Sequence, residues 1–327
     1  MQITRIAMHE GPHLDEILAC VLLRVHGEKR FPGVSQAKLI FWSYGGEVPP
    51  DGPSAQELFR QGTLLLGQGF GPFDEHPCPE RGIARKSGES TSSLVARVLG
   101  YYERGYSPVV RAVRYLVKLV TEQDLNGSPG LLTIEQTLSA MSRDNVPSDK
   151  MFVWGAAAVT TLIHDQISFQ QEFDRAAGGN YHYRLLGDCE PFRLAVVESD
   201  SEHACRAART RGAHLVIRRD SRGHVTVMKD TKTPISTGLI VAELRRLELA
   251  TCDQPIPPAG DPFWVAEGRC AGWYYHPIIG LITTGGNRTA RLAHSPLTPF
   301  AQIESAVISV IEQFLQVGAP ALASVTN

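Results

Sequence analysis

The first 26 residues constrain the fold of this chain most, because a short apolar strand leads through a polar turn into an apolar helix. Ile3 to Met8 is typical of a buried strand, and Gly11-Pro12 is typical of a turn. The apolar residues that follow recur at helical spacing, and they are Leu14, Ile17, Leu18, Val21 and Leu22. This order of elements predicts an α/β domain in which the strand belongs to a parallel sheet.

The turn itself carries four polar side chains, His9, His13, Asp15 and Glu16, at the carboxyl end of the strand. Ligands bind outside such strand ends in open α/β sheets, and imidazole with carboxylate is a ligand set that suits Mn, Zn or Fe. A metal site is one interpretation. In the other, the histidines are ordinary loop residues and the acidic side chains favour the positive end of the helix dipole. The turn alone supports both equally.

Composition narrows the class of protein without naming a function. The chain has 327 residues, 43% of them hydrophobic, and a formal net charge of -2, as expected for a globular chain with two domains and no strong field for nucleic acid. No signal peptide and no membrane-length apolar segment is evident, so we expect a cytoplasmic protein that does not enter a membrane. Six cysteines lie far apart without a Cys-x-x-Cys pair, and Cys20 is expected in the core of the first helix.

Strand-like and helix-like segments alternate in the first half, and a helical run follows them. Lys38 to Trp42 and Thr63 to Leu66 are predicted strands, and Gly178-Gly179-Asn180 ends the helical run. The predicted helices before this break are Ser92 to Tyr102, Val109 to Val120, Thr133 to Met141 and Phe152 to Phe173. Strands are then expected at Phe192 to Val197, Ala213 to Arg218, His224 to Met228 and Ile278 to Thr283, with helices at Ser201 to Arg211, Gly238 to Leu249 and Phe300 to Leu315. We therefore expect a parallel-sheet domain with a helical layer at 1–184, a smaller α/β domain at 185–327, and an active-site cleft between them.

Two further polar clusters follow predicted elements. Asp74, Glu75 and His76 come after the Thr63 to Leu66 strand, with glycines in the intervening turn, and Asp124 follows an apolar helical stretch. Each cluster also has an ordinary explanation as turn or helix-end polarity. The joint occurrence of these clusters with the first turn is what favours a site. From the polar residues that follow the apolar helical stretch, we select Asp124.

Taken together, the three clusters resemble the DHH phosphoesterase superfamily, and most closely its melanocyte-proliferating-gene family of metal-dependent exonucleases. The opening motif of that family is similar to HEGPHLDEILA, which places its two histidines and aspartate on His9, His13 and Asp15. The resemblance extends over most of the chain. It implies metal ligands at these positions and at Asp124.

The chain departs from the family pattern at two places. The Asp-His-His motif falls on Asp74-Glu75-His76, so Glu75 stands where the family has a ligating histidine. The family's bridging aspartate falls at or next to Leu65, which offers no ligand atom. Near the C-terminus, a segment similar to the one that ends in Gly-Gly-Asn in the family supplies expected substrate contacts, and these are His276, Gly285, Gly286, Asn287 and Arg288. A glycine-rich hairpin with an exposed arginine is the alternative for this segment.

The resemblance implies a divergent phosphoesterase that uses a divalent metal, with Mn expected, to hydrolyse a nucleotide or short oligonucleotide. His9, His13, Asp15, Glu75 and Asp124 are the expected ligands, and His76 with Asp74 the expected catalytic pair. The alternative is a nucleotide-binding or nucleic-acid-binding protein with weakened catalysis. A third possibility is a move to another substrate on the same fold. The sequence gives no indication of oligomeric state.

Overall fold

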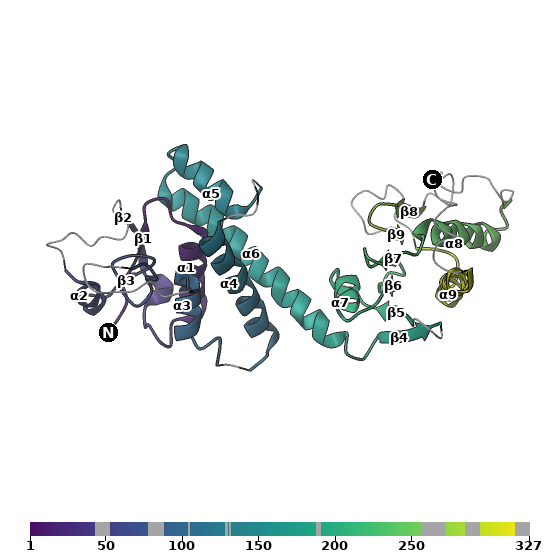
Figure 1. Ribbon diagram of the computed structural model, residues 1–327, viewed down its shortest axis with the longest axis horizontal. Helices are drawn as coiled ribbons and strands as arrows, with labels where there is room; N and C mark the ends of the chain where they lie inside the picture. The colour runs from purple at the N-terminus through teal and green to yellow at the C-terminus, as the bar shows by residue number, and fades with distance from the viewer. Residues whose placement is uncertain are drawn as a thin grey trace. The chain divides into compact units, whose positions relative to one another are not determined.

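The chain divides into two compact units, Met1–Gln170 and Gln171–Asn327, and each is described by itself. The computed structural model describes residues 1–42, 53–77, 88–103, 105–127, 130, 132–187, 191–256, 272–284 and 295–317. The first unit is a parallel sheet with helices, and the second is a larger mixed sheet with helices (Figure 1). The predicted α/β class is therefore confirmed for both units. The assignment of residues 1–184 to metal binding and of 185–327 to substrate binding stays a prediction.

Unit 1 is built on three parallel strands in the order β2-β1-β3. The strands are β1 (Arg5–His9), β2 (Lys38–Trp42) and β3 (Thr63–Leu65). The helices are α1 (Leu14–His26), α2 (Ala55–Arg60), α3 (Thr91–Val98), α4 (Pro108–Asn126), α5 (Ile134–Arg143) and α6 (Ser148–Arg175), with a 3₁₀ turn at Val34–Gln36. The unit boundary falls within α6, after Gln170. Because the strands are parallel, their carboxyl ends meet at one edge, and the polar turns after β1 and β3 lie there together.

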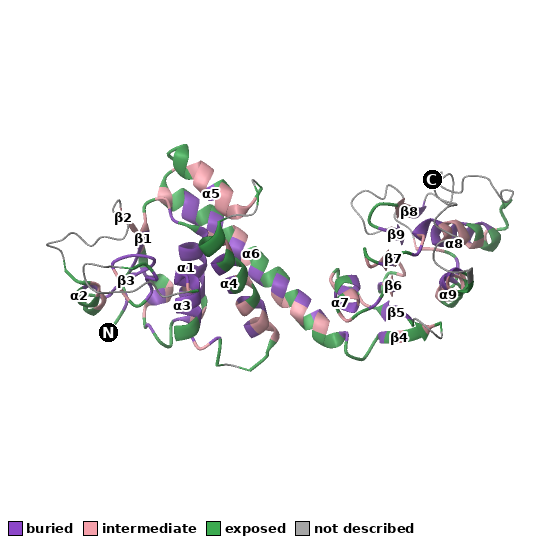
Figure 2. Cartoon of the chain, in the orientation of Figure 1, coloured by how far each residue is buried: buried purple, intermediate pink, exposed green. Residues whose placement is uncertain are grey.

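Alternation along β1 separates two apolar layers. Ile6 and Met8 face the main core with α1, whereas Ala7 packs with Leu58 and Leu65 in a smaller cluster on the other face. Ten consecutive residues at the start of α1, Leu14 to Leu23, are buried, and Figure 2 shows this helix almost entirely in the colour for buried residues. A helix buried on all sides belongs in the centre of a domain, so α1 is the element around which unit 1 packs. Cys20 lies in this core, as expected.

Unit 2 holds a six-stranded sheet in the order β4-β5-β6-β7-β9-β8. Among the strand pairs in the described residues, β5 and β6 are parallel and the other pairs are antiparallel. The strands are β4 (Tyr181–Leu186), β5 (Phe192–Glu198), β6 (Leu215–Arg219), β7 (Val225–Lys229), β8 (Trp273–His276) and β9 (Leu281–Thr284), and the helices are α7 (Ala204–Thr210), α8 (Thr237–Thr251) and α9 (Phe300–Val317). Apolar side chains of the strands, α8 and α9 form a second core. Strand β4 was not predicted, and the strand expected from Ile278 begins only at Leu281, after a turn.

No helix in the described ranges combines the length and the apolar character that crossing a membrane requires.

One buried hydroxyl in unit 1 gives a stability prediction. Thr63 is 1% exposed at the start of β3, and its Oγ1 has no hydrogen-bond partner among the described residues. We expect Thr63→Val to raise the free energy of unfolding by about 1 kcal/mol, because it removes a buried polar group that makes no bond and keeps the shape of the side chain. Urea denaturation measures the change. The control is Thr4→Val, which deletes a hydroxyl that donates to the Gly62 carbonyl over 3.3 Å and should give no such gain. A loss of stability in Thr63→Val would contradict the prediction.

Candidate metal centre

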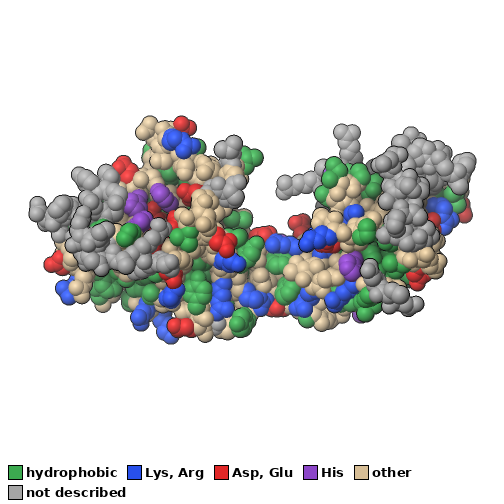
Figure 3. Space-filling model, viewed as in Figure 1, with side chains coloured by type: hydrophobic (Ala, Val, Ile, Leu, Met, Phe, Trp, Pro, Cys, Tyr) green, Lys and Arg blue, Asp and Glu red, His purple; other side chains and the backbone are tan. Residues whose placement is uncertain are grey.

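A cavity of about 930 Å³ opens in unit 1 beyond the carboxyl ends of the three strands. His9 ends β1, Trp42 ends β2 and Gly67 follows β3, and all three line it. In the described part of the chain, its charged lining consists of carboxylates and histidines with no Lys or Arg, and these residues are Glu10, Asp15, Glu16, Asp74, Glu75, Asp124, Glu135, His9, His13 and His76. On the face shown in Figure 3, histidine side chains come to the surface of unit 1 beside acidic ones. Such a lining attracts cations and repels anions.

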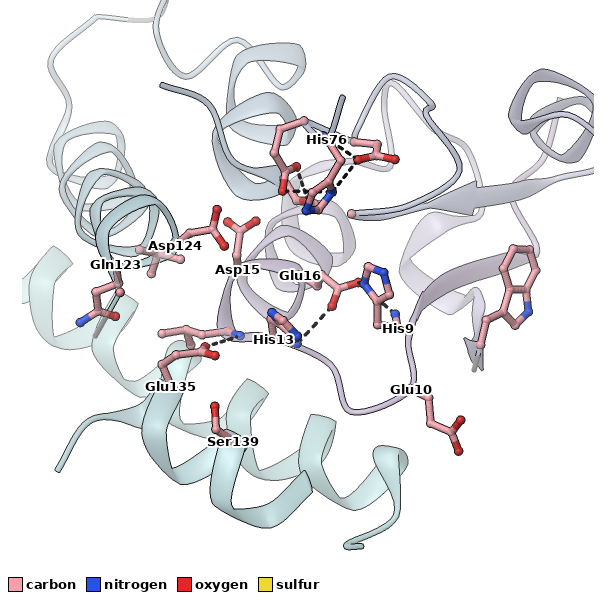
Figure 4. Close-up of a pocket in the computed structure, with 18 of the residues that line it drawn as sticks. His9, Glu10, His13, Asp15, Glu16, His76, Gln123, Asp124, Glu135 and Ser139 are labelled. Atoms are coloured by element: carbon pink, nitrogen blue, oxygen red, sulfur yellow. Dashed lines mark hydrogen bonds and ion pairs between the residues drawn. The ribbon is translucent and has the colours of Figure 1, made fainter. Parts of the chain in front are cut away.

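All seven side chains that the sequence predicted in unit 1 line this cavity. They come from the β1 turn, from α1, from the loop after β3 and from α4. Single ligand atoms of Asp15, Glu75 and Asp124 lie within 4.8 Å of one another, and so do those of Asp74, Glu75 and His76. In Figure 4 the carboxylates of Asp15 and Asp124 lie side by side. Glu75 belongs to both groups and therefore stands at their junction.

Burial and charge repulsion raise the pKa values of Asp15 and Glu75 in this group. Burial raises the pKa of Asp15, although hydrogen bonds from Ser92 and Ser90 oppose the rise. Burial also raises the pKa of Glu75, and the neighbouring Asp15 charge adds to it. Two like charges about 4 Å apart repel by about 4 kcal/mol at an effective dielectric constant of 20. A divalent cation would relieve that repulsion, and an all-oxygen donor set fits Mn or Mg.

Asp74 and His76 form a hydrogen-bonded pair in the other group. Asp74 Oδ1 accepts hydrogen bonds from the His76 backbone N–H over 2.9 Å and from Nδ1 over 2.8 Å, while Oδ2 accepts from the Phe70 N–H over 2.7 Å. Burial alone would raise the pKa of Asp74, but these bonds outweigh it and the pKa is lowered. The bond to Asp74 raises the pKa of His76. Because Nδ1 is engaged, Nε2 is the nitrogen of His76 that can act on a ligand.

The sequence analysis did not assign a role in the site to Glu16, which ties the first histidines together. Its Oε1 accepts from the His9 backbone N–H and from His9 Nδ1, both at 3.0 Å, and its Oε2 accepts from the His13 N–H over 3.1 Å. Glu16 is thus the third residue of a capping box that starts α1. The same carboxylate orients the His9 ring and leaves its Nε2 for a metal, as outer partners of ligating histidines do. The signal in the sequence was an acidic residue three positions after the residue that caps the helix.

The Glu16 contact leads to a testable change in the titration of His9. The hydrogen bond between His9 Nδ1 and the Glu16 carboxylate is the main cause of the raised pKa of His9. We expect Glu16→Gln to lower that pKa toward the ordinary value, because the neutral amide no longer favours the imidazolium. Titration of the imidazole resonances by NMR in metal-free protein measures it. Glu10→Gln, which removes a carboxylate from the same cavity lining, is the control and should leave the His9 pKa where it is. Equal pKa values in Glu16→Gln and the natural protein would refute this role of Glu16.

Other supporting residues come from α3 and α5. Ser90 and the Ser92 backbone bond to Asp15, and Thr91 bonds to Glu75. Glu135 Oε2 accepts from the Leu14 N–H over 3.0 Å, which joins α5 to the start of α1. The sequence analysis did not select these residues.

The expected substrate contacts lie in unit 2 or outside the described residues. His276 ends β8 and is half-buried. Gly285, Gly286, Asn287 and Arg288 fall outside the described residues. Leu65, where the resemblance leads to no ligand, is buried in the smaller apolar cluster with Ala7 and Leu58. Strand β3 thus supplies no ligand atom from this position.

Comparisons with known proteins add little. No protein-family model matches the chain, and no curated protein matches it. Among solved structures it is similar to a DHH-domain protein described as a member of a family of ribosomal proteins, with 8% identity, a TM-score of 0.31, and coverage of 96% of this chain and 87% of that one. It is also similar to an uncharacterized protein from Helicobacter pylori G27, with 10% identity, a TM-score of 0.26, and coverage of 96% and 100%. At these values neither likeness assigns chemistry, and membership of the DHH superfamily stays a proposal.

Proposed function

We propose that this chain is a divergent DHH-type phosphoesterase, related to the melanocyte-proliferating-gene family, that uses manganese to hydrolyse a nucleotide or short oligonucleotide in the cytoplasm. The observation that carries the proposal is the cavity in unit 1, where ligand atoms of Asp15, Glu75 and Asp124 lie within 4.8 Å of one another and three histidines line the same cavity. The seven carboxylates of its lining favour a bound cation, and such a cation would favour the approach of a phosphate.

The chain's own residues suit distinct parts of a hydrolysis. A divalent metal, when bound, would neutralise the phosphate and favour deprotonation of water. Asp15, Glu75 and Asp124 would hold it through oxygen, and His9 and His13, which line the cavity but belong to neither three-residue group, would add nitrogen ligands. His76 is the candidate general acid, because Asp74 orients its ring and raises its pKa, which keeps more of it protonated near neutral pH. Its Nε2 would donate the proton to the leaving oxygen as the P–O bond breaks.

The test is Mn²⁺ binding by the full chain, measured by calorimetry, together with hydrolysis of bis(p-nitrophenyl) phosphate and of end-labelled dinucleotides. We expect metal-dependent turnover, and a fall in kcat of about 100-fold or more in His76→Ala. The control is His164→Ala, which removes an exposed histidine on α6. Absence of both metal binding and turnover would overturn the proposal.

One observation favours a second function. Leu65 places an apolar side chain in a core cluster where the family resemblance leads to a bridging ligand. A chain with an incomplete ligand set would bind metal and nucleotide without cleaving. Metal binding and nucleotide binding without turnover in the same assay would identify this binding protein.

A further inference from the structure

The residue that caps α3 and the first two residues of that helix carry buried hydroxyl groups, which lie beside the carboxylates of Asp15 and Glu75. Ser90, Thr91 and Ser92 are each 0% exposed, although serine and threonine are mostly surface residues. Buried polar side chains destabilise the fold unless they make hydrogen bonds. The hydrogen-bond partners of these three residues therefore indicate why their hydroxyl groups are buried.

The partners are the candidate metal ligands. Ser90 Oγ donates to Asp15 Oδ1 over 2.8 Å, and the Ser92 backbone N–H donates to the same oxygen over 3.0 Å. Thr91 Oγ1 donates to Glu75 Oε2 over 3.0 Å. Each carboxylate thus has one oxygen that accepts hydrogen bonds from the start of α3, and these bonds leave its other oxygen for a cation. The positive end of the α3 dipole favours both negative charges in the same place.

Glu75 has the greater need of such support. Its side chain has one more rotatable bond than an aspartate, and His76 Nδ1 lies 3.7 Å from its Oε1, beyond hydrogen-bond distance. Among the described residues, Thr91 donates the side-chain hydrogen bond that helps to fix the carboxylate of Glu75. Gly67 leaves space for the Thr91 hydroxyl, because a Cβ at Gly67 would lie 3.2 Å from Thr91 Oγ1.

We propose that Thr91 is a positioning residue that acts through Glu75, holding it as a one-oxygen ligand so that the three carboxylates present a preformed cation site. This inference rests on the proposed function, because it concerns the same metal centre. Hydrogen-bond partners of metal ligands typically change metal affinity by about 10- to 100-fold when they are removed.

The experiment compares Mn²⁺ affinity in full-length variants by calorimetry. We expect Thr91→Val to bind about tenfold more weakly or worse, and Thr91→Ser, which keeps the hydroxyl, to bind within about twofold of the natural protein. Thr63→Val makes the same change at a buried threonine whose hydroxyl bonds no described residue, and it should bind normally. If Thr91→Val does not fold by circular dichroism, Thr91→Ala is the second variant without a hydroxyl.

A double variant separates positioning from general packing. Because Thr91 acts through Glu75, adding Thr91→Val to Glu75→Gln should cause no further loss of affinity. An additive loss, or weaker binding in Thr63→Val as well, would overturn the inference in favour of a packing effect. So would normal affinity in Thr91→Val. If the natural protein binds no Mn²⁺, both the proposed function and this inference are wrong. The results for the Thr91 and Thr63 variants test the role of Thr91 alone.

Discussion

Asp15→Asn is expected to weaken Mn²⁺ binding by more than about 100-fold and, at the same time, to stabilise the metal-free protein. Removal of a partner outside the ligand shell already costs up to about 100-fold, and loss of a charged ligand exceeds that. The gain in metal-free stability arises because Asp15 is buried beside Glu75 and Asp124, so one of three mutually repelling charges disappears. Asparagine can still accept the bonds from Ser90 and Ser92 through its Oδ1.

Calorimetry measures the affinity, and thermal unfolding with EDTA or with Mn²⁺ measures the stability. The natural protein should unfold at a higher temperature with Mn²⁺ than with EDTA, since a ligand that binds only the folded state stabilises it. Asp15→Asn should show almost no such difference. Glu10→Gln removes the same charge from the same cavity, outside both three-residue groups, and should behave like the natural protein. Unaltered Mn²⁺ affinity in Asp15→Asn would exclude Asp15 from the site.

The metal-free protein is expected to lose stability as the pH rises through the ordinary pKa of carboxyl groups, about 4, and then through that of histidine, about 6.5. Asp15 and Glu75 have raised pKa values, so in this range the folded state binds more protons than the unfolded state and rising pH opposes folding. His9 and His76 also have raised pKa values, and the stability they contribute at low pH is lost as the pH rises through those values. The lowered pKa of Asp74 acts at lower pH, where its contribution is lost as the pH falls.

Saturating Mn²⁺ should reverse this slope, because the metal competes with protons for the same groups and binds better as they ionise. Urea denaturation at a series of pH values, with EDTA and with Mn²⁺, gives both curves. The double variant Asp15→Asn with Glu75→Gln is the control, and its metal-free curve should be flatter. Stability that rises with pH in EDTA would mean that burial does not destabilise the charged form of these carboxylates in the folded protein.

Local patterns predicted most of the elements. Strand β2 was expected at Lys38 to Trp42, as the structure has it, and β1 was found within two residues of its bounds, whereas α4 continues six residues beyond the expected end at Val120. Strand β4 was missed although Tyr181, Tyr183 and Leu185 alternate with His182 and Arg184, because it directly follows the Gly-rich break and only Tyr181 in it is buried.

The candidate site divides in a similar way. His9, Asp15, Glu75 and Asp124 could be selected because strand-end turns and acidic clusters are visible in the sequence. Thr91 could not, since its role depends on a contact to Glu75 across a loop, and a run of serine and threonine before a helix is equally typical of a helix cap. The bond from Ser90 to Asp15 spans 75 positions, and no local pattern reports such a contact.

The charge of the cavity lining also imposes an order of events on the proposed reaction. Seven carboxylates line the space that a phosphoester would enter in the proposed reaction, and their negative charge opposes the entry of an anion while no cation is bound. The cation must arrive first and the anion second, because electrostatic repulsion opposes the reverse sequence. Turnover would then depend steeply on how much free metal the surroundings supply, which makes metal availability a gate on substrate entry as well as a requirement of the chemistry.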